Sequence, residues 1–202
     1  MSSTATTRHG LTPAPTGFNV VQNFINTDGG GQPDLLADVA TAEQWFTAEL
    51  ADWSATAGVA APTVSFGERD RQRLVELRAQ LRQTLHHRGS PSDAPSGWLV
   101  GSGVSAGLRQ RCDGTVVASP QGAGWKLVAS LLLIESLAAQ TSSLWPRLKV
   151  CRNEACGSAF YDRSRNNSGV WHDVLVCGNA INLRTSRARR RAAAAAPPDP
   201  GE

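Results

Sequence analysis

Apolar residues recur at helical spacing along most of the first three quarters of the chain. Phe18, Val21 and Ile25 stand at i, i+3 and i+7, which predicts a short amphipathic helix that ends at glycines 29–31. Longer patterns of the same period predict further helices over residues 34–57, 65–87 and 123–141. This part of the chain is therefore expected to be mainly helical.

Two of these helices carry a capping signal. Thr41 with Gln44, and Ser65 with Glu68, form capping boxes, in which two side chains satisfy free backbone N–H groups at a helix start. We therefore expect helical turns to begin at Thr41 and at Ser65.

One short stretch departs from the helical period. Residues 104–112 and 115–119 flank Asp113-Gly114, which predicts a β-hairpin with a two-residue turn. Residues 89–97 have the composition of a loop. The expected fold class is mainly α with an α+β character, namely a helical N-terminal domain with one β-hairpin, followed by a small C-terminal module.

Positive charge is concentrated in that module. Residues 1–146 carry ten Lys and Arg against twelve Asp and Glu, whereas residues 147–191 carry ten against three. The tail after residue 191 has two acidic residues and no basic one. Such an asymmetry indicates a polyanionic partner for the C-terminal part of the chain.

The same module holds three of the four cysteines. Cys151, Cys156, His172 and Cys177 are spaced C-x4-C-x15-H-x4-C, so each of two short loops would supply two ligands to one metal ion. Three thiolates and one imidazole form an ordinary set of ligands for a structural Zn²⁺. A glycine follows Cys156 and Cys177, where positive φ would let the backbone turn around the sulfur. The spacing predicts one structural zinc.

Two other interpretations of these residues remain open. The thiols could be buried cysteines that share a region with a surface histidine by chance. A catalytic zinc would need an open coordination position, which would arise if His172 pointed away from the metal. The chain contains no HExxH and no deaminase signature that would favour this second interpretation.

At this point the sequence resembles a known family, the CGNR zinc fingers. The matching residues are Cys151, Cys156, the stretch FYDRSRN at 160–166, Trp171, His172 and Cys177-Gly178-Asn179. His172 stands where the family has its third cysteine, a conservative change for zinc. Ala180 stands where the family has its signature arginine, which removes one positive side chain. The resemblance implies a transcription regulator that binds DNA.

The same family usually carries an N-terminal ABATE domain, found in stress-induced transcription regulators. Residues 18–30 are similar to the opening helix of that domain, with Asn26-Thr27-Asp28 as the matching core. The domains expected from pattern and resemblance together are a flexible arm (1–15), a helical ABATE-like domain (16–147), the zinc finger with its basic helix (148–192) and a disordered tail (193–202).

Residues after the last metal ligand are expected to form a basic helix that binds nucleic acid. Arg184, Arg187 and Arg191 share one helical face, and Arg189 and Arg190 widen it. Further candidate contacts are Arg163 and Arg165 for phosphates and Asn179 and Asn182 for base edges. The alternative is a solvated helix end whose arginines complement the helix dipole.

The N-terminal domain is expected to sense a small-molecule effector or to form a homodimer. Asn26, Thr27 and Asp28 could line a ligand pocket, or could form a helix C-cap and turn. No catalytic triad, phosphate loop or carboxylate pair is convincing, so we do not expect an enzyme.

The sequence therefore predicts a zinc-finger DNA-binding transcriptional regulator. The alternative is a small-molecule-binding or protein-interaction module in which the zinc is purely structural. The longest apolar stretch is too short to span a membrane and contains Glu135, and the N-terminus has no apolar signal segment. A cytoplasmic location with no membrane partner is expected.

Overall fold

A computed structural model of the chain describes residues 4–88 and 102–195. The elements are, in order, η1 (Thr7–His9), η2 (Thr16–Phe18), α1 (Asn19–Ile25), α2 (Val39–Ala57), α3 (Glu68–His86), β1 (Ala106–Gln110), β2 (Val116–Pro120), α4 (Trp125–Thr141), η3 (Trp145–Arg147), β3 (Leu148–Val150), β4 (Ala159–Tyr161), η4 (Val174–Gly178) and α5 (Asn179–Ala195). The predicted fold class is confirmed, because helices dominate and the strands form two small antiparallel sheets.

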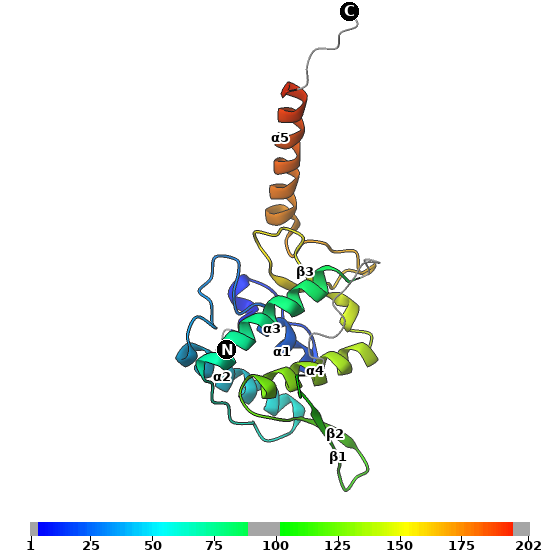
Figure 1. Cartoon of the computed structure of the whole chain (residues 1–202). Coiled ribbons are helices and arrows are strands. Elements are labelled where there is room, and N and C mark those ends of the chain that lie inside the picture. The colour runs from blue at the N-terminus through cyan, green and yellow to red at the C-terminus, as the bar shows by residue number, and fades with distance from the viewer. Residues whose placement is uncertain (1–3, 89–101, 196–202) are drawn as a thin grey trace, which may run out of the picture.

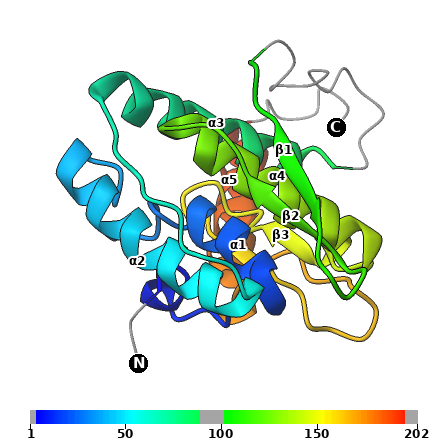
Figure 2. The ribbon, with the colours of Figure 1, turned by 90° about the horizontal axis from the view of Figure 1, so that it is seen from below.

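The short helix α1 lies at the centre of the N-terminal part, with α2, α3 and α4 around it (Figure 2). Phe24 and Ile25 of α1 have no exposed surface. The ring of Phe46 from α2 packs against Phe24 and against Phe66, with centroids 6.1 and 5.3 Å apart. Burial of these aromatic and aliphatic side chains is the main favourable term for folding this part.

Residues expected to form a flexible arm are packed in the structure. Ala5, Thr6 and Ala14 are buried, and the Thr6 N–H donates to Asn23 Oδ1 at 3.2 Å. The Ala14 N–H donates to Gln22 Oε1 at 2.6 Å. Residues 4–15 therefore belong to the folded unit, because polar side chains of the buried helix α1 hold their backbone.

Both helix caps differ from the predicted ones. Asp38 caps α2 by accepting from the Thr41 N–H and hydroxyl, each at 2.8 Å, so Thr41 lies in the first turn and is not the cap. At α3 the capping residue is Gly67, whose N–H donates to Asp70 Oδ2 at 2.9 Å. A carboxylate accepts more strongly than a hydroxyl, which favours the aspartates at these ends.

The predicted hairpin is present with a different turn. β1 and β2 pair with Gln110 opposite Val116, and Arg111 N–H donates to Thr115 O. Residues 111–115 connect the two strands, and the bond between Arg111 and Thr115 closes a three-residue turn, 112–114, with Gly114 at φ 82°. That turn places Cys112 at an exposed position. The predicted loop 89–97 and the end of the predicted tail, 196–202, lie outside the described residues.

Glu49 of α2 is a buried acid that should make stability depend on pH. Burial raises its pKa from 4.5 to about 7, partly offset by the hydrogen bond that Asn23 Nδ2 donates to it at 2.7 Å. Between these two pKa values the unfolded chain has released the proton that the folded chain retains. Folding stability should therefore fall as the pH rises from 4.5 to 7, by about 3 kcal/mol in all.

The variant Glu49→Gln keeps the acceptor for Asn23 but cannot ionise. We expect it to be more stable than the wild type at pH 8 and to lose this part of the pH dependence, measured by urea unfolding between pH 4.5 and 8. Glu76→Gln, which removes an exposed carboxylate from α3, is the matched control. Parallel pH profiles of wild type and Glu49→Gln would contradict the assignment.

Candidate metal centre

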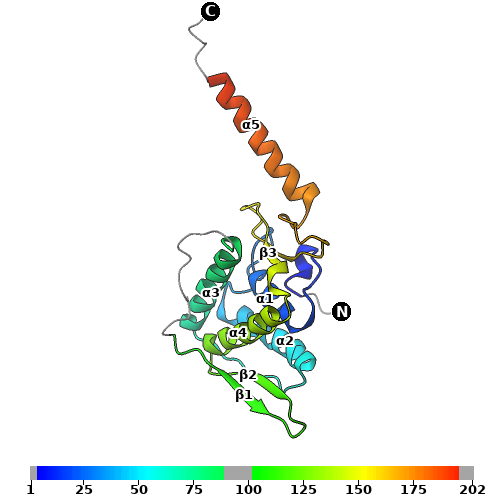
Figure 3. The ribbon, with the colours of Figure 1, turned by 90° about the vertical axis from the view of Figure 1, so that its right-hand side faces the viewer.

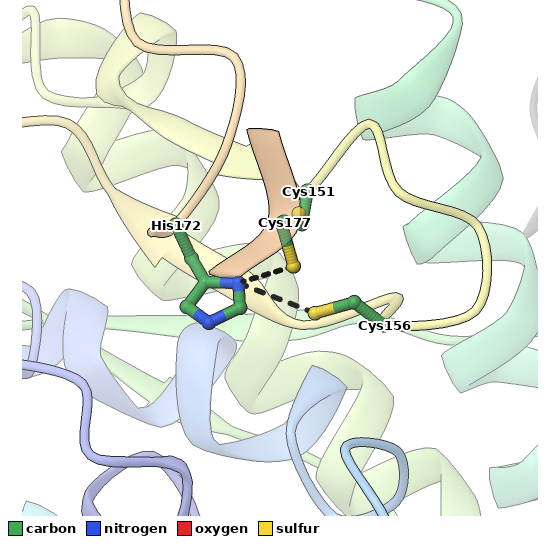
Figure 4. A group of neighbouring side chains, drawn as sticks. All are labelled: Cys151, Cys156, His172 and Cys177. Carbon is green, nitrogen blue, oxygen red and sulfur yellow. Dashed lines mark hydrogen bonds between the residues drawn. The ribbon is translucent and has the colours of Figure 1, made fainter. Parts of the chain in front are cut away.

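Two short segments bring the four predicted ligands together (Figure 4). Cys151 follows β3, and Cys156 lies in the turn that leads to β4. His172 precedes η4, and Cys177 lies within it. The metal-ligating atoms all lie within 4.8 Å of one another, and no other such cluster occurs among the residues that the structure describes.

The spacing of the ligand atoms fits a tetrahedral ion. His172 Nδ1 lies 3.2 Å from Cys156 Sγ and 3.6 Å from Cys177 Sγ. Zn–S bonds of about 2.3 Å and Zn–N bonds of about 2.0 Å place tetrahedral ligand atoms about 3.5 to 3.8 Å apart. His172 faces the sulfurs, so all four coordination positions have a protein ligand. The group fits a single closed zinc site, as expected of a structural metal.

The backbone around Cys156 is shaped for this role. The N–H groups of Cys156 and Gly157 both donate to Asn153 O, at 2.8 and 3.1 Å, and Gly157 adopts φ 60° as predicted. The prediction for Gly178 was wrong, since its φ is not positive. A Cβ there would lie 3.4 Å from Val174 and 3.6 Å from Trp171, which is ordinary van der Waals contact, so the packing does not require glycine at 178.

Neighbouring polar groups hold the thiols in place. Asn153 Nδ2 donates to Cys177 Sγ at 3.4 Å, and Cys156 Sγ lies 3.3 Å from the Ser158 hydroxyl. The hydrogen bond with Cys151 lowers the pKa of Cys156, and the same bond raises the pKa of Cys151. Zinc binding would release the protons that the thiols hold, because thiolates are the ligating form.

A buried ion pair orders the loop between the two ligand pairs. Lys149 Nζ contacts Asp162 Oδ2 at 2.7 Å and donates to the carbonyls of Asn167 and Gly169. Burial alone would raise the pKa of the Asp162 carboxyl group. The hydrogen bonds from Lys149, Ser164 and Gly169 outweigh this effect of burial, so the pKa of Asp162 lies below its usual value. The loop therefore has internal support that does not involve the metal.

Asn26 and Thr27 are buried, Asp28 is half-buried, and all three make structural contacts. Asn26 follows α1 as its C-cap, and its amide donates to Ala159 O at 2.9 Å and accepts from Ala159 N at 2.8 Å. Thr27 accepts from Arg78 at 2.8 Å, and Asp28 pairs with Arg78 and Arg82. Gln22 also donates to Ala159 O, at 3.2 Å.

These contacts join α1 to strand β4 of the zinc finger. We call the hydrogen bonds of Gln22 and Asn26 with Ala159 the α1–β4 joint. Their geometry supports the capping alternative for Asn26 and gives the predicted pocket no support. The joint is not evident from the sequence, because a lone Ala159 carries no signal of its partner.

The predicted nucleic-acid residues fall into two groups. Arg163 donates to Pro13 O at 2.8 Å and stacks over Tyr161, which ties it to the N-terminal segment, while Arg165 is exposed. The remaining candidates lie on α5, which leaves the body of the protein as a projecting helix (Figures 1 and 3). All of them are exposed, namely Asn179, Asn182, Arg184, Arg187, Arg189, Arg190 and Arg191. Ala180, in the first turn, is half-buried.

The fold and the metal centre together define a zinc-finger protein with a helical N-terminal domain. The model of the ABATE family, described as "Putative stress-induced transcription regulator", matches residues 19–132, and that of the CGNR zinc finger matches residues 147–190. The first match covers more than half of the chain, so the protein belongs to the ABATE family and carries a CGNR zinc finger. No curated protein matches the chain. None of the helices within residues 4–88 and 102–195 could cross a membrane.

Proposed function

We propose that the protein is a cytoplasmic transcriptional regulator that binds duplex DNA through α5. The observation that carries this proposal is the projection of α5 away from the body with five exposed arginines. None of these arginines forms an ion pair with another described residue. Seventeen helical residues span about 26 Å, long enough to lie along a groove of DNA.

The zinc finger would set the direction of this helix. Cys177 is a metal ligand in η4, and α5 begins two residues later. The Asp173 carboxylate accepts from Val176 N–H at 3.0 Å, which fixes the turn between His172 and Cys177. A metal-fixed turn followed at once by a basic helix orients the arginines without requiring other contacts from the body.

Different residues would then serve affinity and selectivity. The arginines would neutralise phosphates, which supplies affinity that depends on salt but carries no base information. Asn179 and Asn182 are exposed near the start of α5, where amides could bind base edges. The proposal assigns sensing or dimerisation to the N-terminal helical domain.

Removal of two α5 charges tests the proposal. Arg187→Ala with Arg190→Ala should weaken duplex binding at least about tenfold and lower the slope of log K against log salt by about 2. Fluorescence anisotropy of a labelled random duplex over a salt series measures both quantities. The variant Arg69→Ala with Arg109→Ala, which removes two exposed arginines of the N-terminal domain, is the control with equal charge loss.

A second candidate function is a protein-interaction module, and one observation favours it. Val174, Leu175 and Val176 at the base of α5 are 64, 77 and 64% exposed. Consecutive exposed apolar residues beside a basic helix suit a protein partner with an acidic, partly apolar surface. If the protein does not bind duplex DNA at moderate salt, or if the two double variants bind it with equal affinity, the result would favour this candidate over DNA binding.

A further inference from the structure

A cleft of about 460 Å³ separates the C-terminal end of α3 from the zinc finger. Its walls come from both domains: residues 85–88 from the end of α3 on one side, and residues around β3 and the 169–170 segment on the other. Figure 1 shows the end of α3 beside β3. An adjoining hollow of about 440 Å³ shares His86, His87 and Val150 with it. The volume is in the range of small-molecule sites.

The lining of this cleft is basic. It includes His86, His87, Arg88, Lys149 and Arg152, and none of its lining residues is acidic. Lys149 is already paired with Asp162 and two carbonyls, so its charge is compensated. The Arg152 side chain has no polar partner within the described residues, and both histidines are exposed. Among the described residues, these donors thus face a cleft that no carboxylate lines, and Glu154 lines only the adjoining hollow.

Arg88 adds a cation that no acidic residue in the described part of the chain neutralises. Its two terminal nitrogens donate to the carbonyls of Trp145 and Leu148, at 2.6 and 2.7 Å, and the guanidinium stacks on Trp145. Its Nε is buried without a hydrogen-bond partner. Burial lowers the pKa of Arg88 to about 10. A partly buried positive charge without a counter-ion favours an anion nearby.

We propose that this cleft binds an anion with phosphate or carboxylate oxygens. Arg152, His86 and His87 would contact the anion, and the positive charge of Arg88, which also lines the cleft, would attract it. The anion would bridge the ABATE domain and the zinc finger, so its binding would act on both. Two sources share this chemistry: a free small anion, which would be an effector, and a backbone phosphate of bound DNA. Only the second source rests on the proposed function.

Binding of inorganic pyrophosphate to the zinc-loaded full chain tests the site. Isothermal titration calorimetry at constant ionic strength should give saturable binding of one pyrophosphate, and Arg152→Ala should weaken it at least about tenfold through loss of a charge-assisted contact. His86→Ala with His87→Ala should weaken it independently, which covers the case of an unstable Arg152 variant. Arg109→Ala removes an exposed arginine of β1, outside the cleft, and should leave binding unchanged.

The absence of saturable binding by the wild type would overturn the proposal, as would equal weakening by Arg109→Ala and Arg152→Ala. If the anion is a DNA phosphate, duplex should displace pyrophosphate, and Arg152→Ala should also weaken duplex binding. If it is a free effector, pyrophosphate should bind the duplex complex, and Arg152→Ala should spare duplex affinity. Because the first titration contains no DNA, the cleft and the α5 proposal can fail separately.

Discussion

Replacing Cys177 with alanine is expected to remove the zinc and to release residues 171–195 from the body of the protein. Structural zinc supplies about 10 kcal/mol or more of apparent folding free energy in isolated fingers, far more than a single side-chain contact. The variant should contain no zinc by elemental analysis, where the wild type should contain one per chain. If DNA binding depends on α5, it should also be lost.

Strands β3 and β4 of the finger should respond to the loss of zinc differently from the second half of the finger. β4 is tied to α1 through Ala159, and Leu148 of β3 accepts from Arg88. These bonds do not involve the metal, so the β3–β4 pair should keep its amide protection after zinc loss. Hydrogen exchange of the Cys177→Ala variant should rise steeply after residue 170 and little in β3, β4 and the loop that Lys149 holds.

Cys112→Ala is the matched control, because Cys112 is the one cysteine outside the cluster and is exposed in the hairpin turn. It should keep the zinc and the exchange pattern of the wild type. Retention of one zinc per chain by Cys177→Ala, with an unchanged exchange pattern, would contradict a closed four-ligand site.

Asn26→Leu should destabilise the whole protein by about 3 kcal/mol. Leucine fills a similar volume but makes none of the three hydrogen bonds of the amide. The Ala159 carbonyl would keep Gln22 as a donor, whereas the buried Ala159 N–H would lose its acceptor, Asn26 Oδ1. The Thr6 hydroxyl would also lose a donor. Leaving a buried N–H unsatisfied is the main cost.

Urea unfolding followed by circular dichroism measures this loss. Asn166→Leu is the control, because Asn166 is exposed in the same finger and should change stability by less than about 0.5 kcal/mol. If Asn26→Leu unfolds at the urea concentration of the control, the α1–β4 joint contributes no stability.

The metal centre was predictable from sequence because coordination chemistry depends on residue types at short spacings. Each ligand pair is separated by four residues, so each local loop presents its two ligands almost independently of the rest of the fold. The long helices were predictable for a similar reason, since their apolar positions repeat within the same segment.

The α1–β4 joint could not be predicted from sequence, because Asn26 and Ala159 are 133 residues apart and neither residue's sequence context indicates the other. Asn26 beside Thr27 and Asp28 is typical of a helix end, which it also is. The prediction of the helix caps was wrong for a different reason. Several polar residues stand near each helix start, and the local geometry decides which of them reaches the free N–H groups.

The α1–β4 joint also bears on how the chain folds during synthesis. α1 is made early, yet Gln22 and Asn26 find a partner only when Ala159 has left the ribosome. Until then the interior of the N-terminal domain contains polar side chains without their native acceptors, and contacts of such large sequence separation form slowly. The N-terminal domain should therefore reach its final stability only after the zinc finger has been synthesised, so translation order and folding order differ in this protein.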